Sequence, residues 1–205
     1  MSDYLVYSAA ALLGYLLGSS NMAVYLAAHK GVDLSRGSGN PGASNALILM
    51  GWKAAVLVGL HDIGKAVLAV WLAGRLFPGA ACCGAVAGVA CVLGHMFPFY
   101  RPLRGGKGFA AYFGMTLALN WRFALILAAA VLIVTLATDY IVVGTMTTVI
   151  SFPLYCAVTG RLVTAAVLCA ASVIIIYRHR QNLARIWNGT EIGFRSANRG
   201  DHRQK

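Results

Sequence analysis

Acidic residues, and charged residues in general, are scarce in this 205-residue sequence, which has six Asp and Glu against 17 Lys and Arg. Charged residues of both signs make up 11% of the chain, whereas soluble globular domains have about 25%. The alternation of apolar and polar residues that marks a membrane β-barrel is also missing. The apolar residues lie instead in long blocks, which are typical of membrane-spanning helices. The composition therefore excludes a soluble enzyme and predicts an all-α integral membrane protein.

The sequence also lacks a C-x-x-C pair and any His/Cys spacing typical of a ligand set, so we expect no metal and no other cofactor. All five cysteines lie in apolar blocks and are expected to be small buried hydrophobic residues rather than acyl-carrying nucleophiles. They are Cys82, Cys83, Cys91, Cys156 and Cys169. The opening stretch "MSDYLVY" has no basic segment of the kind that begins a signal peptide, so we expect the first helix to be retained.

Seven apolar blocks predict a bundle of about seven transmembrane helices, one of them short. The blocks are Tyr4–Ala28, Ala54–Gly74, Ala81–Phe99, Phe109–Leu119, Phe123–Thr138, Tyr140–Val158 and Leu162–Tyr177. Phe109–Leu119 is the short one, since at about 1.5 Å per residue it cannot cross a hydrocarbon core of about 30 Å. We find no repeat or linker, and expect one transmembrane domain over residues 1–194 and a basic cytoplasmic tail over 195–205.

The positions of the basic residues predict the orientation of the chain. If the N-terminus is outside and every block crosses the membrane, thirteen of the 17 Lys and Arg residues lie on the inner side, while Arg75, Arg122 and Arg161 lie outside. Cytoplasmic loops of membrane proteins carry such an excess of positive charge. We therefore expect an outer N-terminus and a cytoplasmic C-terminus. The inner charge either serves topology and attraction to anionic lipid or forms a site for anionic substrates.

The first polar cluster is "RGSGNPGASNAL", from Arg36 to Leu47. It is either a turn between helices or an anion-binding loop, because glycines allow backbone N–H groups to converge on an anion while Ser and Asn add side-chain donors. We favour anion binding. The candidate phosphate-binding residues are Arg36, Gly37, Ser38, Gly39, Asn40 and Asn45.

The second cluster, Arg104-Gly105-Gly106-Lys107-Gly108, precedes the short block that starts at Phe109. A glycine-rich loop that leads into the N-terminus of a helix is suited to phosphate, since its amides and the helix dipole favour an anion. Lys107 adds a positive charge. A Walker A loop is excluded because glycine rather than Ser or Thr follows Lys107, so nothing indicates ATP.

Two further clusters contain ionisable residues. In "YRHRQNLARIWNGTE", Tyr177 to Glu191, helical spacing places Arg178, Asn182 and Arg185 on one face, and His179 is close enough to share a ligand with Asn182. An ordinary interfacial histidine is the alternative. The other cluster, His61, Asp62 and Lys65, interrupts the second apolar block. Asp62 and Lys65 are spaced to pair on one helix face, as a structural ion pair or as a functional group inside the membrane.

Together these stretches resemble the PlsY family of bacterial membrane acyltransferases, which move an acyl chain from acyl phosphate to glycerol 3-phosphate. The similar stretches are "GSGNPGASN", "GHMFPFYRPLRGGKG" and "RHRQNLARIWNGTE", together with the Asp-x-x-Lys of Asp62 and Lys65. The resemblance implies a seven-helix protein of the bacterial plasma (inner) membrane. It also implies 1-acyl-glycerol 3-phosphate and phosphate as products, in the first step of phospholipid synthesis. No nucleic acid is expected as a partner, and the sequence leaves the oligomeric state open.

The resemblance also implies roles for individual residues. Ser38, Lys107, His179 and Asn182 would be catalytic. The residues that would bind substrate or its phosphate are Arg36, Gly37, Gly39, Asn40, Asn45, Arg104, Gly105, Gly106 and Gly108. Asp62, Lys65 and Glu191 would be structural. The base that takes the proton of the attacking hydroxyl would be His179, whose type of side chain has an ordinary pKa of about 6.5, or a phosphate oxygen of the donor.

The sequence departs from the family pattern at three places. Gly18-Ser19-Ser20-Asn21-Met22 stands where the family has Gly-Ser-Ile-Pro-Phe. Ile48 replaces an arginine, and Asp139-Tyr140-Ile141-Val142 replaces Arg-Tyr-x-Ser. Arg36 or Arg104 would then substitute for a lost arginine, or the acceptor would differ. The remaining alternatives are a non-catalytic lipid-binding relative and a small-anion transporter that uses His61, Asp62 and Lys65.

Overall fold

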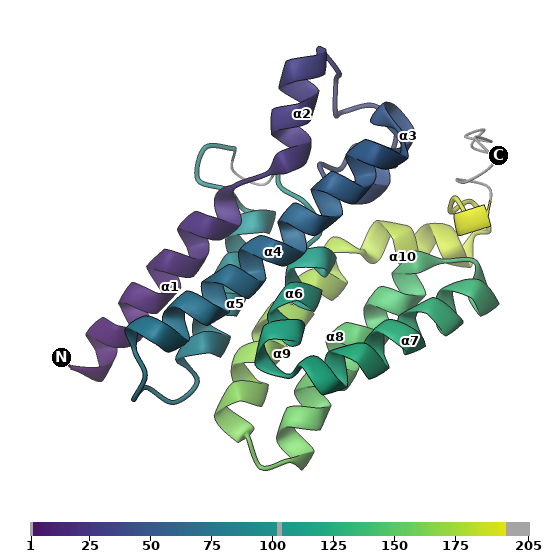
Figure 1. Ribbon diagram of the computed structural model, residues 1–205. Coiled ribbons are helices and arrows are strands. Elements are labelled where there is room, and N and C mark those ends of the chain that lie inside the picture. Colours follow the sequence, from purple (N-terminus) through teal and green to yellow (C-terminus); the bar gives the residue numbers. More distant parts are fainter. Residues whose placement is uncertain (1, 102–103, 196–205) are drawn as a thin grey trace. The chain divides into compact units, whose positions relative to one another are not determined.

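The computed structural model describes residues 2–101 and 104–195, and all regular structure in these ranges is helical (Figure 1). The chain divides into two compact units, Met1–Asn120 and Trp121–Lys205. The first unit contains α1 (Asp3–Ser19), α2 (Met22–Lys30), α3 (Ala43–Met50), α4 (Trp52–Leu76), α5 (Cys83–Met96) and α6 (Phe109–Leu119). The second contains α7 (Trp121–Thr138), α8 (Ile141–Val158), α9 (Leu162–Arg178) and α10 (Arg180–Trp187). Most of the expected tail, residues 196–205, lies outside the described residues.

Several helices are long and apolar enough to cross a membrane, which confirms the predicted all-α membrane fold. By length and composition these are α1 with α2, then α4, α7 and α8, and α9 with α10 if that bent pair is one span. α5 and α6 have 14 and 11 residues and are shorter than a span of about 20 residues. Leu132 and Ile133 of α7 are about 60% exposed, 59% and 65% respectively, as expected for side chains that face lipid. The seven-crossing topology stays a prediction.

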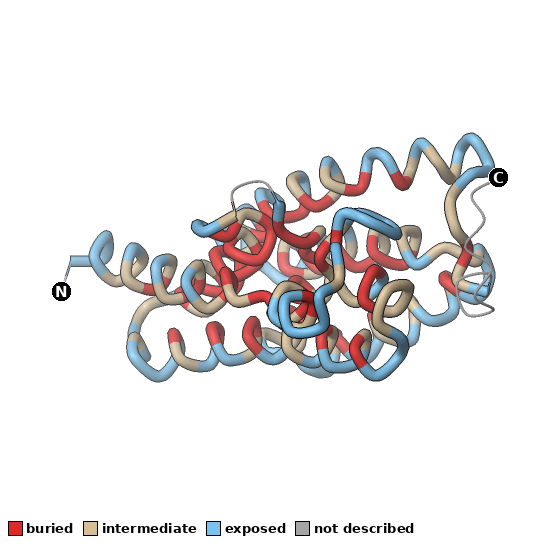
Figure 2. The backbone as a smooth tube through the Cα atoms, turned by 90° about the horizontal axis from the view of Figure 1, so that it is seen from above, coloured by how far each residue is buried: buried red, intermediate tan, exposed pale blue. Residues whose placement is uncertain are grey.

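Glycines allow the helices of the first unit to pack closely. α1 packs along α5, and α4 contacts α5 and α6 (Figure 1). A Cβ atom at Gly14 would overlap the carbonyl of Ala87, and one at Gly18 would overlap the carbonyl of Cys91. Buried and exposed positions alternate by turn along α1, so one side of this helix faces the interior (Figure 2). Small residues are the usual means by which helix backbones approach each other in a membrane.

Two segments of the first unit differ in detail from the prediction. The block Tyr4–Ala28 lies in one candidate span, Asp3–Lys30, but this span contains two helices, because α1 ends at Ser19 and α2 begins at Met22. Asn21 makes the break by capping α2: its Oδ1 accepts from the Val24 N–H at 3.2 Å, while its Nδ2 donates to the Pro41 carbonyl at 3.2 Å. The cluster from Arg36 to Leu47 is not wholly loop either, since α3 begins inside it.

The second unit is built by packing of α8 against both α7 and α9. The Ser172 hydroxyl of α9 donates to the Val149 carbonyl of α8 at 2.7 Å. The rings of Phe123 and Tyr155 stack with centroids 4.1 Å apart. α9 and α10 meet at His179 with a bend of 50°. The expected single helical face of Arg178, Asn182 and Arg185 is therefore wrong, because Arg178 ends α9 while the other two lie on α10.

Candidate active site

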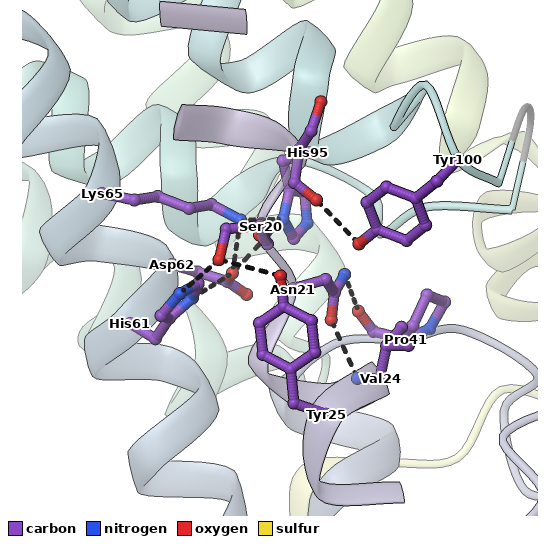
Figure 3. Close-up of polar contacts among 11 residues, drawn as sticks. Ser20, Asn21, Val24, Tyr25, Pro41, His61, Asp62, Lys65, His95 and Tyr100 are labelled. Carbon is purple, nitrogen blue, oxygen red and sulfur yellow. Dashed lines mark hydrogen bonds and ion pairs between the residues drawn. The ribbon is translucent and has the colours of Figure 1, made fainter. Parts of the chain in front are cut away.

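Five polar residues meet inside the first unit and are called the buried cluster below: Ser20, His61, Asp62, Lys65 and His95 (Figure 3). Asp62, Lys65 and His95 are 1%, 6% and 3% exposed, so their charges and polar atoms depend on each other for stabilisation. Their partners come from the α1–α2 break, the middle of α4 and the end of α5. Ionisable groups at such depth in a membrane protein are costly unless paired, and they usually mark function.

Lys65 is the centre of the buried cluster. Its Nζ donates to the Ser20 carbonyl at 2.7 Å, lies 2.8 Å from Nδ1 of His95, and forms an ion pair with Asp62 Oδ1 at 2.8 Å. The Ser20 carbonyl is available because the chain leaves the helical conformation there. The expected pairing of Asp62 with Lys65 on one face of α4 is present. Lys65 also contacts Ser20 and His95, which lie outside α4.

The other side of the buried cluster involves His61. Its Nε2 lies 3.0 Å from the Ser20 hydroxyl, which also accepts a hydrogen bond from Tyr25 at 3.3 Å. Nδ1 of His61 is 3.6 Å from Asp62 Oδ1, beyond hydrogen-bond distance. Ser20 and His61 are half-buried, so they extend the polar network from the buried ion pair of Asp62 and Lys65 toward the outside of the first unit.

The glycine loop Gly105–Gly108 lies directly on His95. The Gly106 N–H donates to the His95 carbonyl at 3.1 Å. A Cβ at Gly106 would overlap Nε2 of His95, and one at Gly105 would overlap the His95 carbonyl. Gly108 has a φ of 94° and is the N-cap of α6, so the loop leads into a helix N-terminus as predicted. Lys107 in this loop is half-buried and Arg104 before it is exposed.

The first loop is the part of the cluster Arg36–Leu47 that precedes α3. Asn45 of α3 holds this loop in place through its side-chain amide. Its Oδ1 accepts from the Ser38 N–H at 2.8 Å and its Nδ2 donates to the Leu34 carbonyl at 3.1 Å. Gly37 and Gly39 have φ values of 63° and 66°, which favour glycine. Asn45 is completely buried, so its geometry fits a residue that shapes the loop better than one that contacts an anion.

The surface of the first loop carries the groups that an anion would meet. Arg36, Ser38 and Gly39 are exposed, and Asn40 is half-buried. Asp33 lies just before them, and the Ser35 N–H and hydroxyl both donate to its carboxylate at 2.9 and 2.8 Å. The Ser35 N–H is the main cause that lowers the pKa of Asp33 below its ordinary value. Asp33 is therefore ionised at neutral pH and held by Ser35.

The second unit brings Asn182 and Arg185 of α10 onto one carboxylate. Asn182 Nδ2 donates to Glu191 Oε1, and Arg185 Nε pairs with Glu191 Oε2 at 2.6 Å. His179 is buried, with Nδ1 2.9 Å from the Ile175 carbonyl. A carbonyl only accepts, so Nδ1 carries a proton; when the ring is neutral, the lone pair is on Nε2. This tautomer is the one that would accept a proton through Nε2.

Asp139 fastens the chain that follows Glu191. It has a φ of 67°, and its carbonyl and carboxylate accept from the N–H groups of Phe194 and Arg195 at 2.7 and 2.9 Å. A Cβ at Gly193 would overlap the Asp139 carboxylate. The departure at Asp139 thus has a structural use within the second unit, where it holds the chain just after the stretch Tyr177–Glu191.

The sequence pattern indicates no role for Ser20, Asn21 or His95, which the structure places at the centre of the polar contacts in the first unit. A polar or ionisable residue within an apolar block was the available signal. No group of three or more His, Cys, Asp or Glu side chains within residues 2–101 and 104–195 has the arrangement of a metal site.

A family model described as glycerol-3-phosphate acyltransferase matches residues 8–189. The chain belongs to the glycerol-3-phosphate acyltransferase family. It is 40% identical over 189 residues to a glycerol-3-phosphate acyltransferase of Pseudomonas paraeruginosa, covering 90% of this chain and 97% of that one. It is 35% identical over 188 residues to glycerol-3-phosphate acyltransferase 1 of Oceanobacillus iheyensis, covering 88% and 91%.

Solved structures of an acyltransferase of this family have the same fold. One crystal structure shows PlsY (YgiH), an integral membrane glycerol 3-phosphate acyltransferase, in its glycerol 3-phosphate form. This structure matches the chain with TM-score 0.87 and 34% identity, over 94% of this chain and 97% of that one. The lysophosphatidic acid form matches with TM-score 0.83 and 33% identity, over 94% and 98%. The prediction of a multi-pass bacterial membrane acyltransferase of this family is confirmed over the transporter and the altered-acceptor alternatives.

Proposed function

We propose that this acyltransferase uses acyl phosphate as donor and the sn-1 hydroxyl of glycerol 3-phosphate as acceptor, and releases lysophosphatidic acid and phosphate. The observation that carries the proposal is the glycine loop that contains Lys107 and leads into α6, because it is suited to a phosphate group. The solved relative in glycerol 3-phosphate and lysophosphatidic acid forms supports this acceptor and product.

The reaction needs no covalent enzyme intermediate. The acceptor hydroxyl oxygen attacks the acyl carbonyl, the bond between the carbonyl carbon and the phosphate oxygen breaks, and phosphate leaves with that electron pair. Acyl phosphate is already activated as a mixed anhydride, so the protein has to orient two anions and stabilise developing charge. Lys107 and the N-terminus of α6 are suited to phosphate, while the Gly106 N–H fixes the loop by donating to the His95 carbonyl. Arg36, Ser38 and Asn40 carry side-chain donors in the first loop, where Gly39 provides the turn through its positive φ and its N–H bond to the Arg36 carbonyl.

The hydroxyl proton goes to Nε2 of His179 or to a phosphate oxygen of the donor. The His179 tautomer described above presents a lone pair at Nε2, which favours the histidine. Asn182 is oriented by Glu191, and Arg185 balances the charge of that carboxylate. We assign Glu191 to positioning, and Asn182 to contact with substrate.

The orientation belongs to the same proposal. With the N-terminus outside, both glycine loops and the stretch Tyr177–Glu191 lie on the cytoplasmic side, where phosphate esters are available. In a background without native cysteines, a cysteine at Ser38 is expected to react with impermeant maleimide only from the cytoplasmic side, and one at Gly79 only from outside. Labelling of both from one side would contradict this orientation.

The function is tested with purified protein, acyl phosphate and glycerol 3-phosphate, following phosphate release and lipid product. We expect Lys107→Ala to lower kcat by about 100-fold or more while the melting temperature is kept, by analogy with the loss of one charge-stabilising donor. Lys107→Arg should restore little, because a wide guanidinium differs from a compact ammonium beside these glycines. Lys53→Ala, an exposed lysine outside the loops, is the control. Near-normal turnover of Lys107→Ala would remove Lys107 from the mechanism.

A further inference from the structure

We propose that His95, held by Lys65, is a positioning residue that sets the glycine loop Gly105–Gly108 for phosphate binding. This inference rests on the proposed function, since it assigns the loop to phosphate. It joins two sets of contacts described above: the buried ion pair of α4 and the backbone of the loop.

The direction of the hydrogen bond between Lys65 and His95 determines the state of the imidazole. Nδ1 of His95 lies 2.8 Å from Nζ of Lys65 and 3.3 Å from Oδ1 of Asp62. We take the shorter contact as the hydrogen bond: an ammonium has three protons and no lone pair, so Nζ donates and Nδ1 accepts. A neutral ring that accepts through Nδ1 has its proton on Nε2. The charge on Lys65 is balanced by Asp62 at 2.8 Å, and its third partner is the Ser20 carbonyl. The imidazole is thereby held in one tautomer and one orientation.

The imidazole ring and the backbone carbonyl of His95 both contact the glycine loop Gly105–Gly108. Nε2 of His95 lies so close to Gly106 that a side chain there would overlap the ring. The His95 carbonyl accepts the Gly106 N–H at 3.1 Å and leaves no room for a Cβ at Gly105. A rotation of the ring therefore shifts Gly106, and with it the next residue, Lys107. Because misplacement of about 1 Å in a site is enough to cost up to roughly 100-fold, such a shift would weaken phosphate binding.

Three substitutions separate this role from general stability. His95→Asn keeps an acceptor, since the amide oxygen of asparagine occupies the position of Nδ1. His95→Leu removes the acceptor while filling similar space. Lys65→Met removes the donor but keeps a long, unbranched side chain. His29→Leu and Lys53→Met, both exposed positions outside the site, are matched controls for loss of an imidazole and of an ammonium.

The measurement is the inhibition constant of inorganic phosphate, together with kcat/KM and the melting temperature in detergent. We expect His95→Leu and Lys65→Met each to weaken phosphate inhibition by about 10- to 100-fold, and His95→Asn by only a few-fold. The double variant His95→Leu with Lys65→Met should lose clearly less than the sum of the two single losses, since the two residues share one contact. Nitrogen-15 spectroscopy of the wild-type protein should find His95 protonated at Nε2 and unprotonated at Nδ1.

Additive losses in the double variant, or equal losses in His95→Asn and His95→Leu, would overturn the proposal, as would a proton on Nδ1. A melting temperature lowered equally in both His95 variants with unequal phosphate inhibition supports positioning over stability. If the wild-type protein transfers no acyl group but phosphate binds with the expected pattern, measured directly by calorimetry, the proposed function fails and the positioning role stands. If the wild-type protein is active and His95→Leu matches it, the positioning role fails alone.

Discussion

The backbone N–H of Ser38 and the side chain of Asn45 are joined by a hydrogen bond of 2.8 Å that closes the first loop onto α3. Asn45 is completely buried and uses its amide group on Ser38 and Leu34. A residue expected to bind phosphate therefore has the contacts of a loop brace. Its effect on an anion would pass through the position of Ser38.

Asn45→Ala is expected to destabilise the protein by about 1–3 kcal/mol, because the Ser38 N–H and the buried Leu34 carbonyl lose their partner. Asn45→Asp should be at least as damaging, since it places a carboxylate oxygen against the Leu34 carbonyl. Thermal unfolding in detergent measures both, and Asn188→Ala at an exposed position is the control. Normal stability with strongly reduced phosphate inhibition would instead assign Asn45 to direct anion binding.

Glu191→Gln and Glu191→Ala should differ in activity. Gln keeps an acceptor for Asn182 Nδ2 and loses the charge facing Arg185, whereas Ala loses both contacts. If orientation of Asn182 is the main role, kcat of Glu191→Gln should stay within about tenfold of wild type, while Glu191→Ala loses clearly more. Steady-state kinetics of the three proteins decide this. Equal losses would show that the negative charge beside Arg185 is what matters.

Gly18→Ala and Gly64→Ala test helix packing in the first unit. A methyl group at Gly18 would overlap the Cys91 carbonyl, so α1 and α5 must separate, at a cost of about 1–3 kcal/mol. Gly64 lies within α4 with no described atom within 4 Å of an added Cβ. Its change to Ala should be neutral or stabilising by up to about 1 kcal/mol. Melting temperatures that fall equally in both variants would contradict the close α1–α5 contact.

Ile48→Arg tests the departure from the family in α3. Ile48 is half-buried and packs beside Gly37 of the first loop, where it offers no donor to an anion. An arginine there should lower KM for glycerol 3-phosphate by about 10- to 100-fold, the value of a charged hydrogen bond. Its effect on KM for acyl phosphate should be smaller. Ile48→Met controls for the change in shape. An unchanged KM would indicate that Arg36 or Arg104 already supplies this contact.

Helix positions were well predicted wherever apolar runs were long and uninterrupted. The expected block Phe109–Leu119 coincides with α6, and α7, α8 and α9 begin or end within two residues of their blocks. The physical reason is local: apolar length, glycine and proline decide which segments form helices in a membrane. The two glycine loops were also recognisable, because the residue types that let amides converge on an anion are adjacent in the sequence.

The sequence by itself determined the all-helical membrane class, the glycine loops and the polar residues available to them. Only the tertiary structure decided that Asn21 breaks the first block, that His179 bends the last one, and that Lys65 contacts Ser20 and His95, which are 45 and 30 residues away. Such contacts depend on how helices pack, and helix packing is set by close approaches such as that of Gly18 to Cys91. A polar residue in an apolar block signals that a partner exists, and the packing determines which partner it finds.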